Sequence, residues 1–261
     1  MSSRSIRVAG VYAAILAGLV GLFALIGLDL PFMVQWTPFL IRQVPLILFV
    51  AVCALGLAIG LGAITALALL SRRAVPWVIA QYYVMIVRGT PMVVQFFLIF
   101  LAMPQMAEHG PAWLHQALIL TPIQTAIVGI ALFHGANLGE VFRAGALSVH
   151  FGQSEAGVVL GMTPGQVARR IVWPQAVRFI VPPLGNHFIM MIKNTALLGF
   201  LGVAEMFSLA DGLGRQHYRH LELLIVAGII YWVLVMTLEK LQGLVERRLE
   251  VTHVRRVVEF G

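Results

Sequence analysis

The chain has 261 residues, of which 60% are hydrophobic and only 11% are charged, and its mean hydropathy is +0.91. A soluble domain carries roughly 25% charged residues, so this composition excludes a soluble globular protein and indicates a chain that lipid solvates. The net charge of +7 comes from basic residues between the apolar runs, which argues for membrane orientation and against a nucleic-acid partner. Cys53 is the single cysteine, which excludes an internal disulfide and a cysteine-based metal cage.

Six apolar runs of 21 residues or more follow in chain order: residues 8–28, 44–70, 77–103, 122–147, 181–201 and 221–245. Each reaches the roughly 20 residues that cross a hydrocarbon core as a helix. Helices are expected because lipid offers no hydrogen-bond partners to the backbone. The first run has no small-residue cleavage site after it, so we interpret it as a retained span. The prediction is an all-α integral membrane protein with about six transmembrane helices.

Lysine and arginine set the expected orientation, because they concentrate on the cytoplasmic side of a membrane protein. With a cytoplasmic N-terminus, the outward side receives only Arg42, Arg215 and Arg219. The cytoplasmic side then receives Arg4, Arg7, Arg72, Arg73, Arg169, Arg170, Arg178, Lys240, Arg247, Arg248, Arg255 and Arg256. This asymmetry predicts that both termini are cytoplasmic.

Residues 148–180 form the longest cytoplasmic interruption, and they carry helix signals of their own. Residues 153–160 are expected to form one short helix, which Gly161 ends. Thr163, Pro164 and Gln166 then match the capping box that opens a second short helix.

Prolines set the expected end of that second helix. It should stop near residue 172, because Pro174 disfavours helical geometry at the residue before it. Pro182 and Pro183 are expected to mark the start of the next span. The segment is therefore predicted to be two helices and a tight turn.

The spacing of residues in this segment matches a known pattern. Glu155-Ala156-Gly157 is followed four residues later by Gly161 and, after nine more residues, by Ile171-Val172-Trp173-Pro174. This resembles the EAA loop of ATP-binding-cassette importer permeases, which reads E-A-A, three residues, G, nine residues, I-x-L-P. Gly157 stands in place of the second alanine and Trp173 in place of the leucine.

Further motifs resemble the polar amino-acid branch of that family. They are Arg88-Gly89-Thr90-Pro91 with Gln95-Phe96-Phe97, Glu140-Val141-Phe142-Arg143-Ala144-Gly145 with Gly152-Gln153, Trp173-Pro174-Gln175-Ala176 with Arg178, Pro182-Pro183-Leu184-Gly185-Asn186, and Lys193-Asn194-Thr195. The resemblance covers residues 42–245 and implies a type I permease domain with a five-helix core. Residues 1–41 are then an N-terminal tail, an extra helix and an outward linker, and residues 246–261 are a cytoplasmic tail.

The resemblance implies that the 148–180 segment docks on a separate ATPase and couples its motion to the spans. The residues expected to carry this coupling are Glu155, Ala156, Gly157, Gly161, Arg169, Arg170 and Pro174. The chain has no phosphate-binding loop of its own, because neither Lys193 nor Lys240 follows the required glycine run. It is therefore not expected to be an enzyme, and ATP and Mg²⁺ would bind to a partner ATPase.

The partners that the resemblance implies are a cytoplasmic ATPase dimer, a second permease, identical or paralogous, and an extracytoplasmic solute-binding protein. The expected location is the cytoplasmic (inner) membrane of a bacterium. The expected solute is a polar amino acid or a related zwitterion.

Polar residues in or near the spans are the candidates for the solute pathway: Arg88, Thr90, Glu140, Lys193 and Asn194. A charge at the bilayer centre costs about 2.5–3.5 kcal/mol, so it should face the bundle interior and be paired. Glu140 and Arg143 can pair on one helix face. Each charge could be structural or could line the route. Arg88 and Lys193 have no acid at three or four residues' distance, and either would complement a carboxylate.

Other classes of function fit less well. An ion-coupled secondary transporter is the alternative, but it usually has an internal repeat, which is absent here. An intramembrane enzyme would need paired catalytic residues within spans, whereas Asp29 and Asp211 lie at span ends. A metal site is not expected, because the histidines of the outward loops lack a third ligand at suitable spacing; these are His109, His115, His217 and His220.

Overall fold

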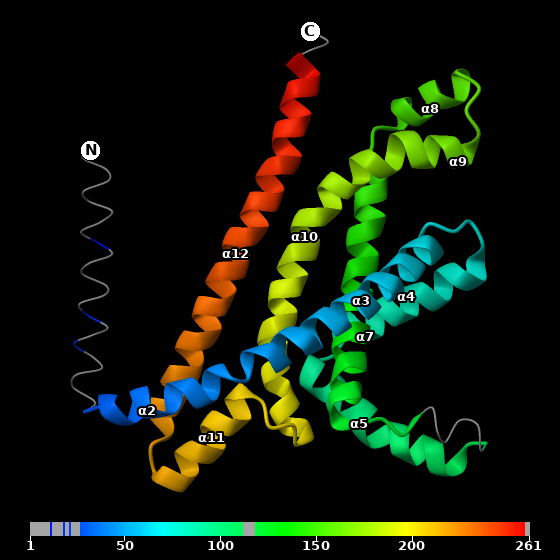
Figure 1. Ribbon diagram of the computed structural model, residues 1–261. Coiled ribbons are helices and arrows are strands. Elements are labelled where there is room, and N and C mark those ends of the chain that lie inside the picture. The colour runs from blue at the N-terminus through cyan, green and yellow to red at the C-terminus, as the bar shows by residue number, and fades with distance from the viewer. Residues whose placement is uncertain (1–10, 12–17, 19–20, 22–26, 112–117, 259–261) are drawn as a thin grey trace.

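The computed structural model describes residues 27–111 and 118–258, together with positions 11, 18 and 21. No strand occurs in this described part of the chain, and the predicted all-helical fold is confirmed. The first predicted span, residues 8–28, lies almost wholly outside the described residues. Figure 1 shows long helices α7, α10 and α12, with the short helices α8 and α9 at one end of the molecule and α11 at the other.

Helix α2 (Leu30–Ile41) replaces part of the predicted outward linker. It begins at Asp29, whose Oδ1 accepts the N–H of Phe32 at 3.1 Å, and it ends where α3 is about to start. Arg219, just before α12, reaches back to Asp29 at 3.4 Å. The sequence pattern did not predict this helix because its 12 residues are too few for a span.

Helices α3 (Val44–Leu69) and α7 (Pro122–Leu147) form two of the predicted spans and pack closely along each other. Glycines allow this approach. A Cβ atom added at Gly139 would lie 2.5 Å from Thr65 Cγ2, and one added at Gly62 would lie 2.8 Å from Leu138 Cβ. Small residues at a contact between membrane helices bring the two backbones together in this way.

The third predicted span is wrong as a single helix, because the chain forms α4 (Ala74–Gly89) and α5 (Met92–His109). Thr90 and Pro91 between them are extended. A proline disfavours helical geometry at the residue before it, which explains the break at Thr90. Gln95 closes the gap: its Nε2 donates to the carbonyl oxygens of Val87 at 2.7 Å and Thr90 at 3.1 Å.

The fifth predicted span begins earlier than expected. Helix α10 runs over Trp173–Asn194, so Pro182 and Pro183 lie inside it rather than at its start. The 3₁₀-helix η2 (Thr195–Leu201) continues it, and α11 (Met206–His217) follows at a bend of 50°. Helix α12 (His220–Val258) contains the last predicted span.

Within the described residues, four helices are long and apolar enough to cross a membrane: α3, α5, α7 and the part of α12 over His220–Arg248. A fifth span results if α10 with its extensions and α11 count as one bent segment. The main apolar core is built by residues of α2, α3, α7, α10, η2, α11 and α12. Its fully buried side chains include Leu40, Ile47, Ile130, Leu138, Met191, Ile192, Leu198, Met206 and Leu223.

Candidate functional site

A tight turn joins the two short helices of the 148–180 segment, as predicted. Helix α8 covers Phe151–Val159, and Gly161 after it has a φ of +78°, a conformation that glycine adopts without strain. The N–H of Met162 bonds to the carbonyl of Gly157 at 3.0 Å, and the N–H of Gly161 bonds to that of Val158 at 2.9 Å. This pair of bonds is the Schellman motif that ends a helix firmly.

The second short helix, α9 (Pro164–Val167), has the predicted capping box. The side chain of Thr163 accepts the N–H of Gln166, whose own side chain accepts the N–H of Thr163 at 2.9 Å. The predicted stop before Pro174 is wrong, because a π-helical turn (Ala168–Val172) carries the chain directly into α10. The N–H of Trp173 bonds to the carbonyl of Ala168, five residues back, and Trp173 stays helical. A wider turn accommodates the proline that a regular helix would not.

Side chains fasten α8 to the π-helical turn and to α10. Gly157 is buried there, and a Cβ added to it would lie 2.7 Å from Ile171 Cδ1 and 3.0 Å from Val167 Cγ2. Gln175 Nε2 donates to Gln153 Oε1, which joins α10 to α8. The segment is therefore one packed unit continuous with α10.

The outer surface of this unit is exposed and chemically mixed. Four of the predicted coupling side chains and Gly161 lie on it: Glu155, Ala156, Arg169, Arg170 and Gly161. The two arginines line a depression of about 610 Å³ together with Thr163, Gly165 and Gln166. Val159 and Leu160 are 86% and 77% exposed, although both are strongly apolar. Pro174 lies on the exposed side of α10, at its first turn.

The candidate pathway residues Arg88 and Thr90 lie at the break between α4 and α5. Arg88 is the last basic residue of α4 and is exposed. Thr90 Oγ1 donates to the carbonyl of Ile86 at 2.8 Å and accepts from Gln95 Nε2 at 2.8 Å.

The other charged candidates separate into a paired and an exposed group. Arg143 Nη2 donates to Glu140 Oε2 at 2.7 Å, which confirms the predicted pair on α7. Lys193 is exposed near the end of α10. Neither Lys193 nor Arg88 makes a side-chain hydrogen bond or ion pair within the part of the chain that the structure describes.

Asn194 belongs to a polar cluster that sequence reasoning missed. Its Nδ2 lies 3.0 Å from His134 Nε2, and His134 Nδ1 lies 3.0 Å from His187 Nδ1. His134 is fully buried on α7, whereas His187 on α10 is half-buried. The sequence does carry a signal for this cluster: two ionisable side chains lie inside predicted spans, where such side chains are rare and usually functional.

A second buried cluster surrounds Glu205, which lies four residues after the fifth apolar run. Its Oε1 accepts the N–H of Ser208 at 2.8 Å and so caps α11. Its Oε2 accepts the hydroxyl of Tyr231 at 3.0 Å, and that hydroxyl lies 3.3 Å from Thr195 Oγ1. The cluster ties η2, α11 and α12 together.

The loop histidines have separate surroundings. His217 packs on the rings of Phe32 and Trp36, and His220 Nδ1 lies 3.3 Å from Asp211. His115 lies outside the described residues. No group of three or more His, Cys, Asp or Glu side chains that could hold a metal ion occurs among the residues placed by the structure. The absence of a metal site remains a prediction.

Comparison with known proteins places this geometry in context. Residues 58–251 match the family model described as "Binding-protein-dependent transport system inner membrane component". The chain is 37% identical over 222 residues to the "Probable amino-acid permease protein YxeN" of Bacillus subtilis, covering 84% of this chain and 95% of that protein. It is 39% identical over 192 residues to the "L-cystine transport system permease protein TcyB" of the same species, covering 73% and 77%.

A solved structure is also similar. It is described as "Crystal structure of an amino acid ABC transporter with histidines" and superposes with a TM-score of 0.75 at 32% identity, covering 85% of this chain and 99% of the other. The similarity therefore extends over nearly the whole length of that transporter chain.

Proposed function

Because this chain belongs to the family of binding-protein-dependent transport system inner membrane components, we propose that it is the permease subunit of an ATP-driven importer of polar amino acids or related zwitterions. The observation that carries the proposal is the 148–180 segment. It is a packed two-helix unit with an exposed apolar and basic surface, and it is continuous with a helix of the bundle. Relatives that are named as amino-acid permeases support the solute class.

The unit is suited to transmit force. Helix α7 ends at Leu147 just before it, and α10 follows its π-helical turn without a break. A partner that grips Glu155, Arg169 and Arg170 would therefore move both helices as levers. Rigid-body motion of this kind switches a transporter between its inward and outward access states. Gly157 acts from inside the unit, where its lack of a side chain allows α8 to pack on Ile171.

Energy comes from a partner in this proposal. ATP and Mg²⁺ bind to a cytoplasmic ATPase dimer, and this chain supplies the docking surface. A second permease, identical or paralogous, completes the pathway, and an extracytoplasmic solute-binding protein delivers the solute. The 148–180 segment, which we call the docking unit, and the C-terminal end of α12 lie at the same end of the molecule, which suits a cytoplasmic location for both (Figure 1).

The route through the membrane uses the polar residues of the interrupted helices. Glu140 is neutralised by Arg143, so Arg88 and Lys193 are the cations open to a solute carboxylate. Thr90 shapes the break beside Arg88, and Asn194 organises the histidine cluster.

The test is uptake by vesicles that contain the purified permease, its ATPase and the binding protein. Uptake of a labelled amino acid should require ATP on the side of the membrane where the ATPase is bound. Uptake should stop when the ATPase is left out. Uptake that persists without the ATPase and follows an ion gradient instead would contradict the proposal.

A further inference from the structure

The histidine cluster forms a chain of hydrogen bonds with a defined direction. The amide Nδ2 of Asn194 can only donate, so His134 Nε2, at 3.0 Å, must accept and carries no proton. A neutral His134 then has its proton on Nδ1, which donates to His187 Nδ1 at 3.0 Å. That nitrogen accepts, and the proton of a neutral His187 is left on its Nε2.

The two ends of this chain differ in their surroundings. His134 is 0% exposed and both of its ring nitrogens are used within the protein. His187 is half-buried, and its Nε2 makes no hydrogen bond within the part of the chain that the structure describes. The chain thus ends in a single oriented N–H group on a half-buried side chain, and this group has no acceptor among the residues that the structure describes.

Packing alone does not account for such an arrangement. Apolar side chains of similar shape would fill the contact between α7 and α10 without any desolvation of polar groups, and replacing both partners of a buried hydrogen bond by apolar groups can be nearly neutral. A polar chain that is satisfied at every inner position fixes one side chain in one orientation.

We propose that His134 is a positioning residue that holds His187 so that its Nε2–H binds the carboxylate of the transported amino acid. This inference rests on the proposed function. The carboxylate is the end of a zwitterion that fits, because it only accepts hydrogen bonds. An ammonium group would place one donor against another at the same nitrogen.

Substitutions can remove the contact made by one ring nitrogen and keep the contact made by the other. His134→Asn keeps a donor near the Nδ1 position and so keeps the contact with His187. His134→Gln keeps a group near the Nε2 position and so keeps only the contact with Asn194. At the other residue, His187→Asn removes the Nε2–H, whereas it leaves a partner for His134.

The experiment measures binding to the purified permease–ATPase complex without the binding protein. The probes are the labelled L-amino acid that the wild-type complex takes up fastest and the labelled amine in which hydrogen replaces the carboxyl group, so that it offers the His187 N–H no acceptor. The wild type and His134→Asn should prefer the acid by about tenfold or more, the loss expected when a buried polar group is left unpaired. His134→Gln and His187→Asn should show a clearly smaller preference, to which only Arg88 and Lys193 still contribute, while both variants still co-purify with the ATPase.

Equal behaviour of His134→Asn and His134→Gln would overturn the proposal, as would an unchanged preference in His187→Asn. Failure of the wild-type complex to bind any amino acid without the binding protein would also overturn it, and would leave ATP-driven uptake intact. Loss of ATP-driven uptake in the wild type is a different result, because it would contradict the proposed function itself.

Discussion

Gly161 is the residue at which the docking unit depends most on backbone conformation. Its φ is +78°, and a Cβ atom added there would meet nothing within 4 Å, so a substitution strains the backbone without causing a clash. Left-handed geometry costs a residue with a side chain about 1–2 kcal/mol. We expect Gly161→Val to distort the turn and to uncouple ATP hydrolysis from uptake, whereas membrane insertion stays normal. The measurement is the ratio of ATP hydrolysed to amino acid taken up in vesicles.

Gly60 on α3 provides the control, because it lies outside this unit, is exposed, has open space around it and has no positive φ. Gly60→Val should keep that ratio within about twofold of the wild type. Asparagine tolerates left-handed geometry better than valine, so Gly161→Asn should fall between the two. A normal ratio in Gly161→Val would show that the turn is not required for coupling.

A glycine is needed at position 157 for a different reason than at position 161: it leaves room for neighbouring side chains, and its φ is not positive. A Cβ at this position would approach the ends of the Ile171 and Val167 side chains at 2.7 and 3.0 Å, and those ends can shift. Gly157→Ala should therefore retain most uptake, since alanine also favours the helix. Gly157→Leu should separate α8 from the π-helical turn and abolish co-purification with the ATPase. Equal co-purification by both variants would contradict this assignment.

At the scale of the elements, the contact of α3 with α7 gives two substitutions with opposite expected signs. Gly139→Ala places a Cβ 2.5 Å from Thr65 Cγ2 and 2.7 Å from Thr65 Cβ, so overpacking should destabilise the protein by about 1–3 kcal/mol. Gly60→Ala on α3 meets nothing within 4 Å, and its higher helix propensity should leave stability unchanged or raise it by about 0.5–1 kcal/mol.

The measurement for this pair is thermal unfolding of the purified complex in one detergent. A lower melting temperature only in Gly139→Ala would support the close crossing of the two helices. Equal melting temperatures would contradict it.

The side-chain amide of Gln95 bridges the break between α4 and α5. Gln95 Nε2 lies 2.7 Å from the Val87 carbonyl and 3.1 Å from that of Thr90. Leaving a buried acceptor unpaired costs about 1–3 kcal/mol, so Gln95→Leu should lower the melting temperature. Gln105→Leu is the control, because Gln105 is exposed on the same helix. An equal effect of both substitutions would show that the bridge is unimportant.

Helix boundaries show where sequence reasoning about elements succeeded and where it failed. The turn at Gly161 and the capping box at Thr163 follow from local backbone chemistry, so the sequence predicted both. Pro91 breaks a helix, but Pro174 does not, because a π-helical turn precedes it. That difference depends on how α8 packs against the turn. A rule that considers only neighbouring residues in the sequence therefore cannot predict whether a given proline ends the helix.

At the scale of the whole molecule, apolar runs predicted the spans formed by α3, α7 and α12, because the length of a membrane helix is set by the bilayer. The clusters inside the bundle were not predictable in this way. His134 and His187 are 53 residues apart in sequence, and Glu205 and Tyr231 are 26 apart. Only the packing of α7 against α10, and of α11 against α12, brings such partners together. Glu140 and Arg143, three residues apart on one helix, were predicted because no tertiary contact is needed.

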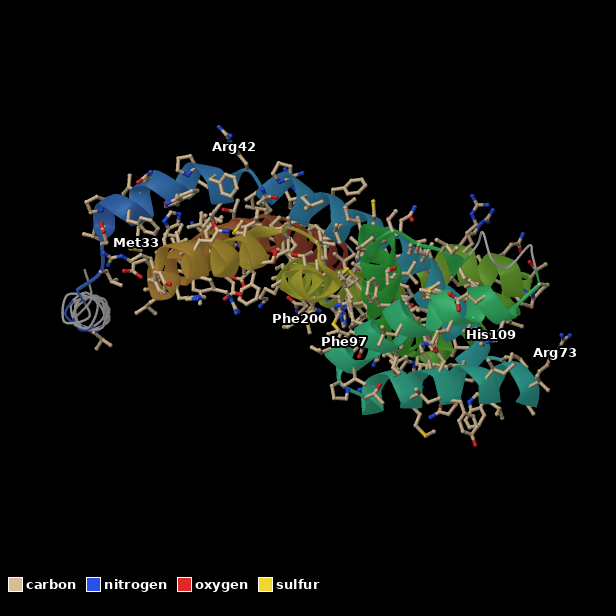
Figure 2. All side chains as sticks on the ribbon, turned by 90° about the horizontal axis from the view of Figure 1, so that it is seen from below. Met33, Arg42, Arg73, Phe97, His109 and Phe200 are labelled. Carbon is tan, nitrogen blue, oxygen red and sulfur yellow. The ribbon has the colours of Figure 1, made fainter. Side chains whose placement is uncertain are left out.

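The arrangement of the spans also predicts which positions share a side of the membrane. Ser71, between α3 and α4, and Gly165, in the docking unit, should both be cytoplasmic, whereas His109 at the end of α5 should face outward. Figure 1 shows α4 starting toward the end that carries α8 and α9, and α5 ending toward the opposite end. Figure 2, seen from below, shows His109 on α5 and Arg73 beside the start of α4.

Cysteine labelling in whole cells tests this arrangement. In a Cys53→Ser background, His109→Cys should react with a membrane-impermeant maleimide, whereas Ser71→Cys and Gly165→Cys should react only after the membrane is made permeable. Cys53 lies within α3, so its removal leaves one thiol in each variant. Reaction of Gly165→Cys in intact cells would place the docking unit outside, where no ATPase could reach it. That result would remove the mechanical basis of the proposed coupling, even if the helices themselves were correctly placed.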